Sequence, residues 1–113
     1  MGGSWCRGRG SESIRLVLFG AGATGSVAAR HLAHLKEIDD LVLADLVTAR
    51  ARGLAAKLRS LKVRAVPMKG TEVGSLVRVL QGADLAINAA HVSLDIPLME
   101  ACLDVGADYM DLS

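Results

Sequence analysis

The sequence has few aromatic residues, few prolines and few cysteines. Aromatic side chains make up 3% of its 113 residues, whereas hydrophobic residues make up 51%. The core must therefore consist of Leu, Val, Ala and Ile, a composition typical of parallel sheets that helices cover on both faces. A chain of this length forms one domain and buries enough surface to fold without crosslinks.

Other absences narrow the functional classes. Cys6 and Cys102 have neither metal-site spacing nor a disulfide framework, so we expect no metal and a reducing, cytoplasmic location. No apolar run reaches the ~18 residues of a membrane span, and the N-terminus lacks the apolar stretch of a signal peptide. Beyond residue 13 the chain has 11 basic and 11 acidic residues. Without a basic stripe, nucleic acid is not an expected partner.

A glycine-rich motif follows the first apolar run, residues 16–19, and precedes a helical pattern over residues 26–35. Its G-x-G-x-x-G spacing is typical of dinucleotide-binding loops. The first glycine permits a tight turn, the second lets the backbone approach a pyrophosphate, and the third lets the helix pack on the strand. The helix N-terminus would hold the phosphates. The predicted cofactor contacts here are Gly20, Gly22, Ala23, Thr24 and Gly25.

An acidic residue completes this motif. Asp45 ends a second apolar run, residues 41–45, twenty residues after the last glycine. A carboxylate there binds the hydroxyls of the adenine ribose and repels a 2′-phosphate. The next residue, Leu46, cannot pair with a phosphate, so the sequence favours NAD. NADP stays open as an alternative because Arg50 or Arg52 could reach a 2′-phosphate.

Strand and helix patterns alternate along the rest of the chain. We expect strands over residues 14–19, 41–45, 62–67, 83–90 and 108–113, and helices over 26–35, 49–61, 72–81 and 95–105. This alternation predicts an α/β fold of the Rossmann type: a parallel sheet of five strands, order 3-2-1-4-5, with helices on both faces. The third strand, half polar and ending in proline, is expected at an edge.

The helical periodicity also predicts which side chains point inward. We expect Val27 and Leu35 on the buried face of the first helix, and Leu61 on that of the second. We expect Asp95 to cap the N-terminus of the last helix.

Ligands of such folds bind outside the carboxyl ends of the strands. Asn88, Ala89 and Ala90 form the end of the fourth predicted strand, on the nicotinamide side of that crevice. Asn88 either positions a ribose or amide group of the cofactor or bonds its own backbone. His91 is the histidine nearest the crevice, but a lone loop histidine is more often not catalytic, so the catalytic residues stay unassigned.

The second half of the chain resembles the saccharopine dehydrogenase family. The residues that carry the resemblance are Asn88-Ala89, Glu100-Ala101-Cys102, Gly106 and Tyr109-Met110-Asp111. The family's N-terminal domain is similar to residues 15–113, which implies an NAD(P)-dependent oxidoreductase that transfers a hydride at a carbon–nitrogen bond of an amino acid or polyamine. The resemblance assigns the glycine loop to the phosphates, Asp45 to the ribose and residues 88–90 to the nicotinamide side.

The sequence departs from the family in having His91 where Pro or Gly is frequent and Leu46 where a basic residue is common. The family also continues into a substrate and dimerisation domain, so we expect residues 14–113 to bind cofactor but to be catalytically incomplete. The alternative is a stand-alone NAD(H)-binding or redox-sensing module. A short-chain or NmrA-like reductase is disfavoured because Ala28 replaces a glycine and a Tyr-x-x-x-Lys dyad is absent. Residues 1–13 are expected to be a disordered tail, and an exposed fifth strand would favour a homo-oligomer.

Overall fold

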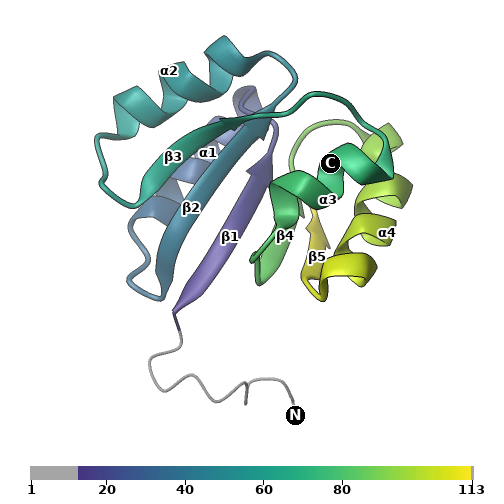
Figure 1. Ribbon diagram of the computed structural model, residues 1–113. Coiled ribbons are helices and arrows are strands. Elements are labelled where there is room, and N and C mark those ends of the chain that lie inside the picture. The colour runs from purple at the N-terminus through teal and green to yellow at the C-terminus, as the bar shows by residue number, and fades with distance from the viewer. Residues whose placement is uncertain (1–12, 113) are drawn as a thin grey trace.

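A parallel sheet with the strand order β3-β2-β1-β4-β5 forms the centre of the chain (Figure 1). This computed structural model describes residues 13–112, so the predicted N-terminal tail lies almost wholly outside the described residues. The strands are β1 (Ile14–Phe19), β2 (Ile38–Asp45), β3 (Val63–Pro67), β4 (Leu85–Asn88) and β5 (Asp108–Asp111). The helices are α1 (Ala23–Ala33), α2 (Thr48–Leu58), α3 (Val73–Leu80), the short 3₁₀ helix η1 (Val92–Leu94) and α4 (Asp95–Val105). The predicted fold class and strand order are confirmed, including the edge position of β3.

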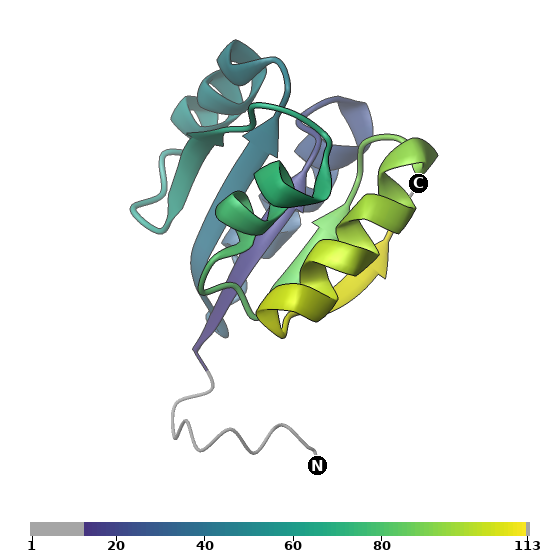
Figure 2. The same ribbon diagram turned by 45° about the vertical axis from the view of Figure 1, so that its right-hand side comes forward.

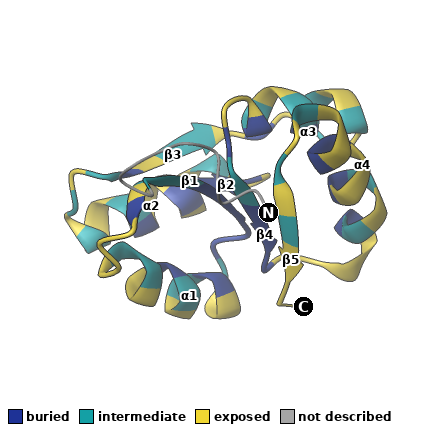
Figure 3. Ribbon diagram, turned by 90° about the horizontal axis from the view of Figure 1, so that it is seen from below, coloured by how far each residue is buried: buried dark blue, intermediate teal, exposed yellow. Residues whose placement is uncertain are grey.

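The first strand shows why its apolar run is unbroken. Leu16 and Leu18 pack into the core between the sheet and α1 and α2, whereas Val17 and Phe19 pack into the core under α3 and α4. Figure 3 shows the two pairs of helices on opposite faces of the sheet. Because successive strand residues point to opposite faces, a strand that is covered on both needs apolar residues at every position.

The second strand begins at Ile38, three residues before the predicted start. Asp39 and Asp40, which precede the predicted start, are part of the strand. The Asp40 carboxylate accepts ion pairs from Arg15, at 2.8 Å, and from Arg64, at 3.2 Å. Two neighbouring strands thus supply the cations that allow an acidic residue to continue β2.

The second helix ends earlier than predicted. It stops at Leu58, and Arg59 adopts a left-handed conformation with φ of 50°. Leu61, expected on the buried face, is fully exposed. The chain reverses without the glycine that usually occupies a left-handed position after a helix, so the sequence carries no stop signal there.

The buried face of α1 is also rotated from the predicted one. Val27 is about half exposed, and Leu35 lies beyond the helix end and is exposed. Gly25 and Ala29 face the sheet instead. Small residues occupy this face because the first turn of α1 lies against the backbone of the loop after β1.

Candidate functional site

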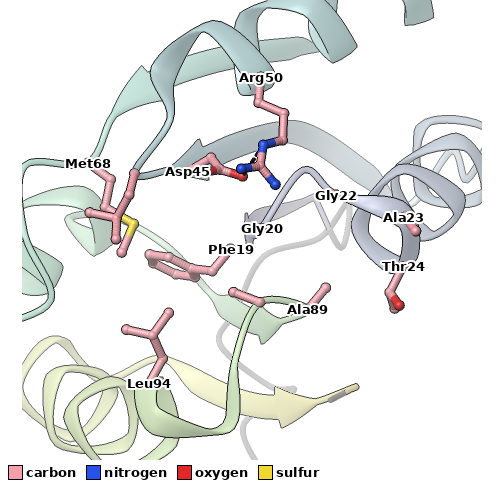
Figure 4. A pocket seen from close by; sticks show the side chains of 12 residues that line it. Phe19, Gly20, Gly22, Ala23, Thr24, Asp45, Arg50, Met68, Ala89 and Leu94 are labelled. Atoms are coloured by element: carbon pink, nitrogen blue, oxygen red, sulfur yellow. Dashed lines mark ion pairs between the residues drawn. The ribbon is translucent and has the colours of Figure 1, made fainter.

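A cleft of about 380 Å³ lies at the carboxyl ends of the central strands (Figure 4). Its lining residues are Phe19, Gly20, Gly22, Ala23, Thr24, Asp45, Leu46, Arg50, Met68, Ala89, Ala90 and Leu94. The cleft is large enough for a small-molecule ligand. Eight of the ten predicted contact residues line it. The other two, Gly25 and Asn88, are not lining residues, although both shape the backbone beside the cleft.

The three glycines meet different geometric demands. Gly20 has φ of +101°, and a Cβ there would lie 2.9 Å from the backbone of Ala89. A Cβ on Gly25 would lie 1.8 Å from the carbonyl oxygen of Gly20. Gly22 differs, because a Cβ there would contact only the Arg50 guanidinium, at 3.5 Å. Two glycines therefore allow backbones to pack closely, and the third leaves space toward the cleft.

The N-terminus of α1 forms one wall of the cleft. The helix starts at Ala23, and its N-cap, Gly22, supplies no side-chain acceptor. The first N–H groups of a helix have no partner within the helix, and they form the positive end of its dipole. The first turn contains no acidic side chain that would neutralise this end. A glycine cradle at an uncapped helix N-terminus fits a phosphate group.

Asp45 connects two loops beside this wall. Its Oδ2 accepts a hydrogen bond from the backbone N–H of Ala21 at 2.8 Å, and its Oδ1 accepts one from Val47 at 2.8 Å. Each carboxylate oxygen has a second lone pair, so ribose hydroxyls can still donate to it. The Arg50 Nε lies 3.7 Å from Oδ2, and Figure 4 shows both side chains at the same end of the cleft.

An apolar wall faces these polar groups. It consists of Phe19, Met68 and Leu94, all buried, which come from the ends of β1, β3 and η1 (Figure 4). None of the three was a predicted cofactor contact, although Met68 begins a segment, residues 68–71, that was expected at the crevice end of the third strand. Phe19 and Met68 are the last apolar residues of their apolar runs, so the sequence could have indicated that they lie at the cleft. Leu94 belongs to η1, whose three residues are too few for a helical period.

Asn88 adopts the second of its two predicted roles. Its side chain is fully buried, its Oδ1 accepts from the Ala90 N–H at 2.9 Å, and its Nδ2 donates to the His91 carbonyl at 3.1 Å. Nδ2 also donates to the Asp95 carboxylate at 2.9 Å. The amide therefore bonds its own loop. Its predicted contact with the cofactor stays a prediction.

Asp95 does not cap α4. The helix begins at Asp95 itself, and its N-cap, Leu94, makes no side-chain capping bond. The Asp95 carboxylate accepts hydrogen bonds from Asn88 and from the Tyr109 hydroxyl instead. The sequence did not predict this cluster, because it joins residues from three separate elements.

His91, the histidine nearest the cleft, bonds its own loop. The His91 Nδ1 accepts from the backbone N–H of Ser93 at 3.0 Å. No three His, Cys, Asp or Glu side chains of residues 13–112 are arranged to hold a metal ion. None of the helices in this range has the length and apolar character needed to cross a bilayer.

Residues 16–113 match the family model of the saccharopine dehydrogenase NADP binding domain. The chain belongs to this family. The family resemblance predicted from the sequence is thereby confirmed, and NAD(P) is the cofactor class of the domain. A similar protein is carboxyaminopropylagmatine dehydrogenase of Synechocystis sp., 39% identical over 99 residues, which are 86% of this chain and 25% of the relative. The chain thus spans about a quarter of the length of that relative.

Solved structures share the fold of this saccharopine dehydrogenase-like domain. Saccharopine dehydrogenase (L-Glu forming) of Saccharomyces cerevisiae superimposes with a TM-score of 0.77 at 21% identity, over 88% of this chain and 22% of that one. Quinate dehydrogenase of Corynebacterium glutamicum, in complex with NAD, gives a TM-score of 0.61 at 24% identity, over 85% and 43%. At these identities the likeness shows the Rossmann-type architecture.

Proposed function

We propose that the chain is the cofactor-binding part of an oxidoreductase that acts on a carbon–nitrogen bond of an amino acid or polyamine. The observation that carries the proposal is the glycine cradle at the uncapped N-terminus of α1, in a chain of this family. When bound, the nicotinamide ring would donate or accept the hydride. Two of the three similar proteins named above are dehydrogenases of saccharopine and of carboxyaminopropylagmatine, which supports this substrate class.

Different lining residues would bind different parts of the dinucleotide. The backbone at Gly22, Ala23 and Thr24 would hold the pyrophosphate, since that stretch combines free N–H groups with the helix dipole. Asp45 would accept the adenine-ribose hydroxyls. The apolar wall that contains Met68 would cover one face of an aromatic ring. Residues 89–90 would border the nicotinamide side, as the sequence predicted.

Asp45 and Arg50 are the ionisable side chains among the described lining residues. Asp45 is bonded to two backbone N–H groups, and Arg50 is paired with it. Neither is free to transfer a proton to a substrate. We therefore expect the chain by itself to bind cofactor without turnover, with the remaining catalytic groups supplied by further polypeptide.

The same observation keeps a stand-alone NAD(H)-binding or redox-sensing module as the second candidate. A reading frame that continues for roughly 200–300 residues would favour the oxidoreductase, because that length matches a second domain. A complete reading frame of this length would favour the module. Either form is proposed to work in the cytoplasm, which agrees with the free thiol of Cys102.

Arg50 bears on the choice between NAD and NADP. It lies in the first turn of α2, where the helix dipole disfavours a cation, and its side chain is 51% exposed beside Asp45. A residue that breaks a local preference at the rim of a cleft is a candidate for function. We propose that both cofactors bind: Asp45 favours the ribose of NAD, and Arg50 pairs with the 2′-phosphate of NADP.

Calorimetric titration with NADH and NADPH tests both parts of this proposal. Arg50→Ala should weaken NADPH binding about tenfold, or ~1.4 kcal/mol, and NADH binding less than threefold. Lys57→Ala is the control for charge, because it removes a positive charge from an exposed position at the far end of the same helix. Gly22→Val should abolish binding of both cofactors, whereas Gly74→Val, in open space on α3, should not.

Two outcomes would contradict the proposal at different levels. If neither cofactor binds the unmodified chain at millimolar concentration, the dinucleotide site itself is wrong. If Arg50→Ala weakens both cofactors equally, the site stands but Arg50 does not recognise a 2′-phosphate.

A further inference from the structure

Three elements meet at one carboxylate oxygen beside the cleft. The Tyr109 hydroxyl, from β5, donates a hydrogen bond to Oδ1 of Asp95, in the first turn of α4. The Asn88 Nδ2, from the end of β4, donates to the same oxygen at 2.9 Å. Figure 2 shows α4 lying along β5, and the contact joins this helix to the edge strand β5 and to its neighbour β4.

The carboxylate determines which way the buried amide points. An ionised carboxylate only accepts hydrogen bonds, so it selects the NH₂ end of Asn88. The amide oxygen must then face the opposite direction, where it accepts from the Ala90 N–H at 2.9 Å. A tyrosine hydroxyl is protonated at neutral pH and can donate to Asp95. Burial and the bond to Asp95 raise the pKa of Tyr109 further, so the hydroxyl also remains a donor in mildly alkaline solution.

The amide in turn holds the loop that borders the cleft. Ala89 and Ala90 are lining residues, and the Ala89 N–H donates to the Phe19 carbonyl at 2.8 Å. The loop also touches the glycine turn, since a Cβ on Gly20 would meet the Ala89 backbone at 2.9 Å. A loop packed this closely cannot move without changing the shape of the cleft.

We propose that Asp95 and Tyr109 are positioning residues for the nicotinamide side of the cleft, acting through the Asn88 amide on residues 89–90. This inference rests on the proposed dinucleotide function. Neither residue lines the cleft. Their effect is largest on the half of the ligand that the loop borders. It is smaller on the half bound by the glycine turn and Asp45, which it reaches only through the packing of Ala89 against Gly20.

A positioning role and a general structural role predict different effects on the two halves of the ligand. The test compares the dissociation constants of NADH and of ADP-ribose, which lacks the nicotinamide ring. Tyr109→Phe and Asp95→Ala should weaken NADH three- to tenfold and leave ADP-ribose within twofold. Asp95→Asn keeps an Oδ1 acceptor but loses the charge and adds an NH₂ donor, so it should weaken NADH binding less than Asp95→Ala does. Asp104→Ala, at an exposed position of the same helix, is the control for charge.

A second readout needs no ligand. The Ala90 amide proton should exchange with solvent at least tenfold faster in Asp95→Ala than in Asp104→Ala, because its acceptor is no longer held. An equal loss of affinity for NADH and ADP-ribose, or unchanged NADH affinity and Ala90 exchange, would overturn the inference while leaving the proposed function intact. Failure of the unmodified chain to bind either ligand would overturn both.

Discussion

Replacing Gly25 with alanine is a direct test of the close contact on which the cleft depends. The added Cβ would lie 1.8 Å from the carbonyl oxygen of Gly20 and 2.7 Å from its carbonyl carbon. Cβ contacts below 3.0 Å essentially do not occur, so α1 must move away by more than 1 Å. Gly20 cannot yield, because its other side is against Ala89 and its φ of +101° already requires glycine.

The expected cost follows from these distances. Overpacking a tight contact costs about 1–3 kcal/mol, and a clash between backbones belongs at the upper end. Alanine's better helix propensity returns at most ~1 kcal/mol. We therefore expect the free energy of unfolding to fall by about 2–3 kcal/mol, which lowers Tm by roughly 8–15 °C in a domain of this size. NADH binding should be lost as well, because the first turn of α1 would be displaced.

Thermal unfolding followed by circular dichroism, with an NADH titration below Tm, measures both effects. Gly53→Ala is the matched control, since Gly53 lies in α2 with no atom within 4 Å of its added Cβ. It should stabilise the chain by about 0.5–1 kcal/mol. A Gly25→Ala variant that melts within 2 °C of the unmodified chain would show that helix and loop do not pack as described.

Three further expectations concern other parts of the molecule. Burial and, secondarily, Asp108 raise the pKa of Cys102 above its ordinary 9.0, and burial raises that of Tyr109 above 10.0. The folded chain therefore keeps these protons to higher pH than the unfolded chain, and its urea midpoint should fall as the pH rises above about 9. A midpoint at pH 10.5 equal to that at pH 8 would contradict this. Leu61→Glu should change the free energy of unfolding by less than ~0.5 kcal/mol, because Leu61 is fully exposed. Leu54→Ala, at a buried position, should lower it by about 2–5 kcal/mol. Equal losses for the two variants in urea titrations would show that Leu61 is buried, as the sequence predicted. Met110 is 48% exposed on the edge strand β5, and we propose that it promotes self-association. Sedimentation equilibrium should therefore show fewer dimers for Met110→Glu than for the unmodified chain. An unmodified chain that is monomeric at every concentration would refute this proposal.

The sequence predicted the architecture well because its signals are local and agree with one another. Apolar runs, helical periods and the glycine motif all indicate alternating strands and helices, and that alternation allows few topologies. The errors lie where tertiary contacts outweigh local rules. The end of α2 depends on Arg59 in a conformation that favours glycine, and the start of β2 depends on arginines of two neighbouring strands.

The candidate site shows the same contrast between local signals and contacts of distant segments. The glycine turn and Asp45 belong to a linear motif, so their spacing alone predicted that they lie beside one cleft. The apolar wall of Phe19, Met68 and Leu94 is assembled from three distant segments, and no sequence pattern connects them. Its members could be suspected only by asking which residues end each strand.

Asp95 shows how one side chain can satisfy a local preference and a distant one. An N-cap aspartate is worth about 1 kcal/mol, which is why the sequence favours that role. One position later, the carboxylate still benefits from the helix dipole, and it also accepts hydrogen bonds from β4 and β5. The buried amide of Asn88 needs such an acceptor, because an unsatisfied NH₂ group would cost about 1–3 kcal/mol. Substitutions in β5 that never touch the cofactor should therefore alter the cleft, whereas substitutions on the exposed side of α4 should not.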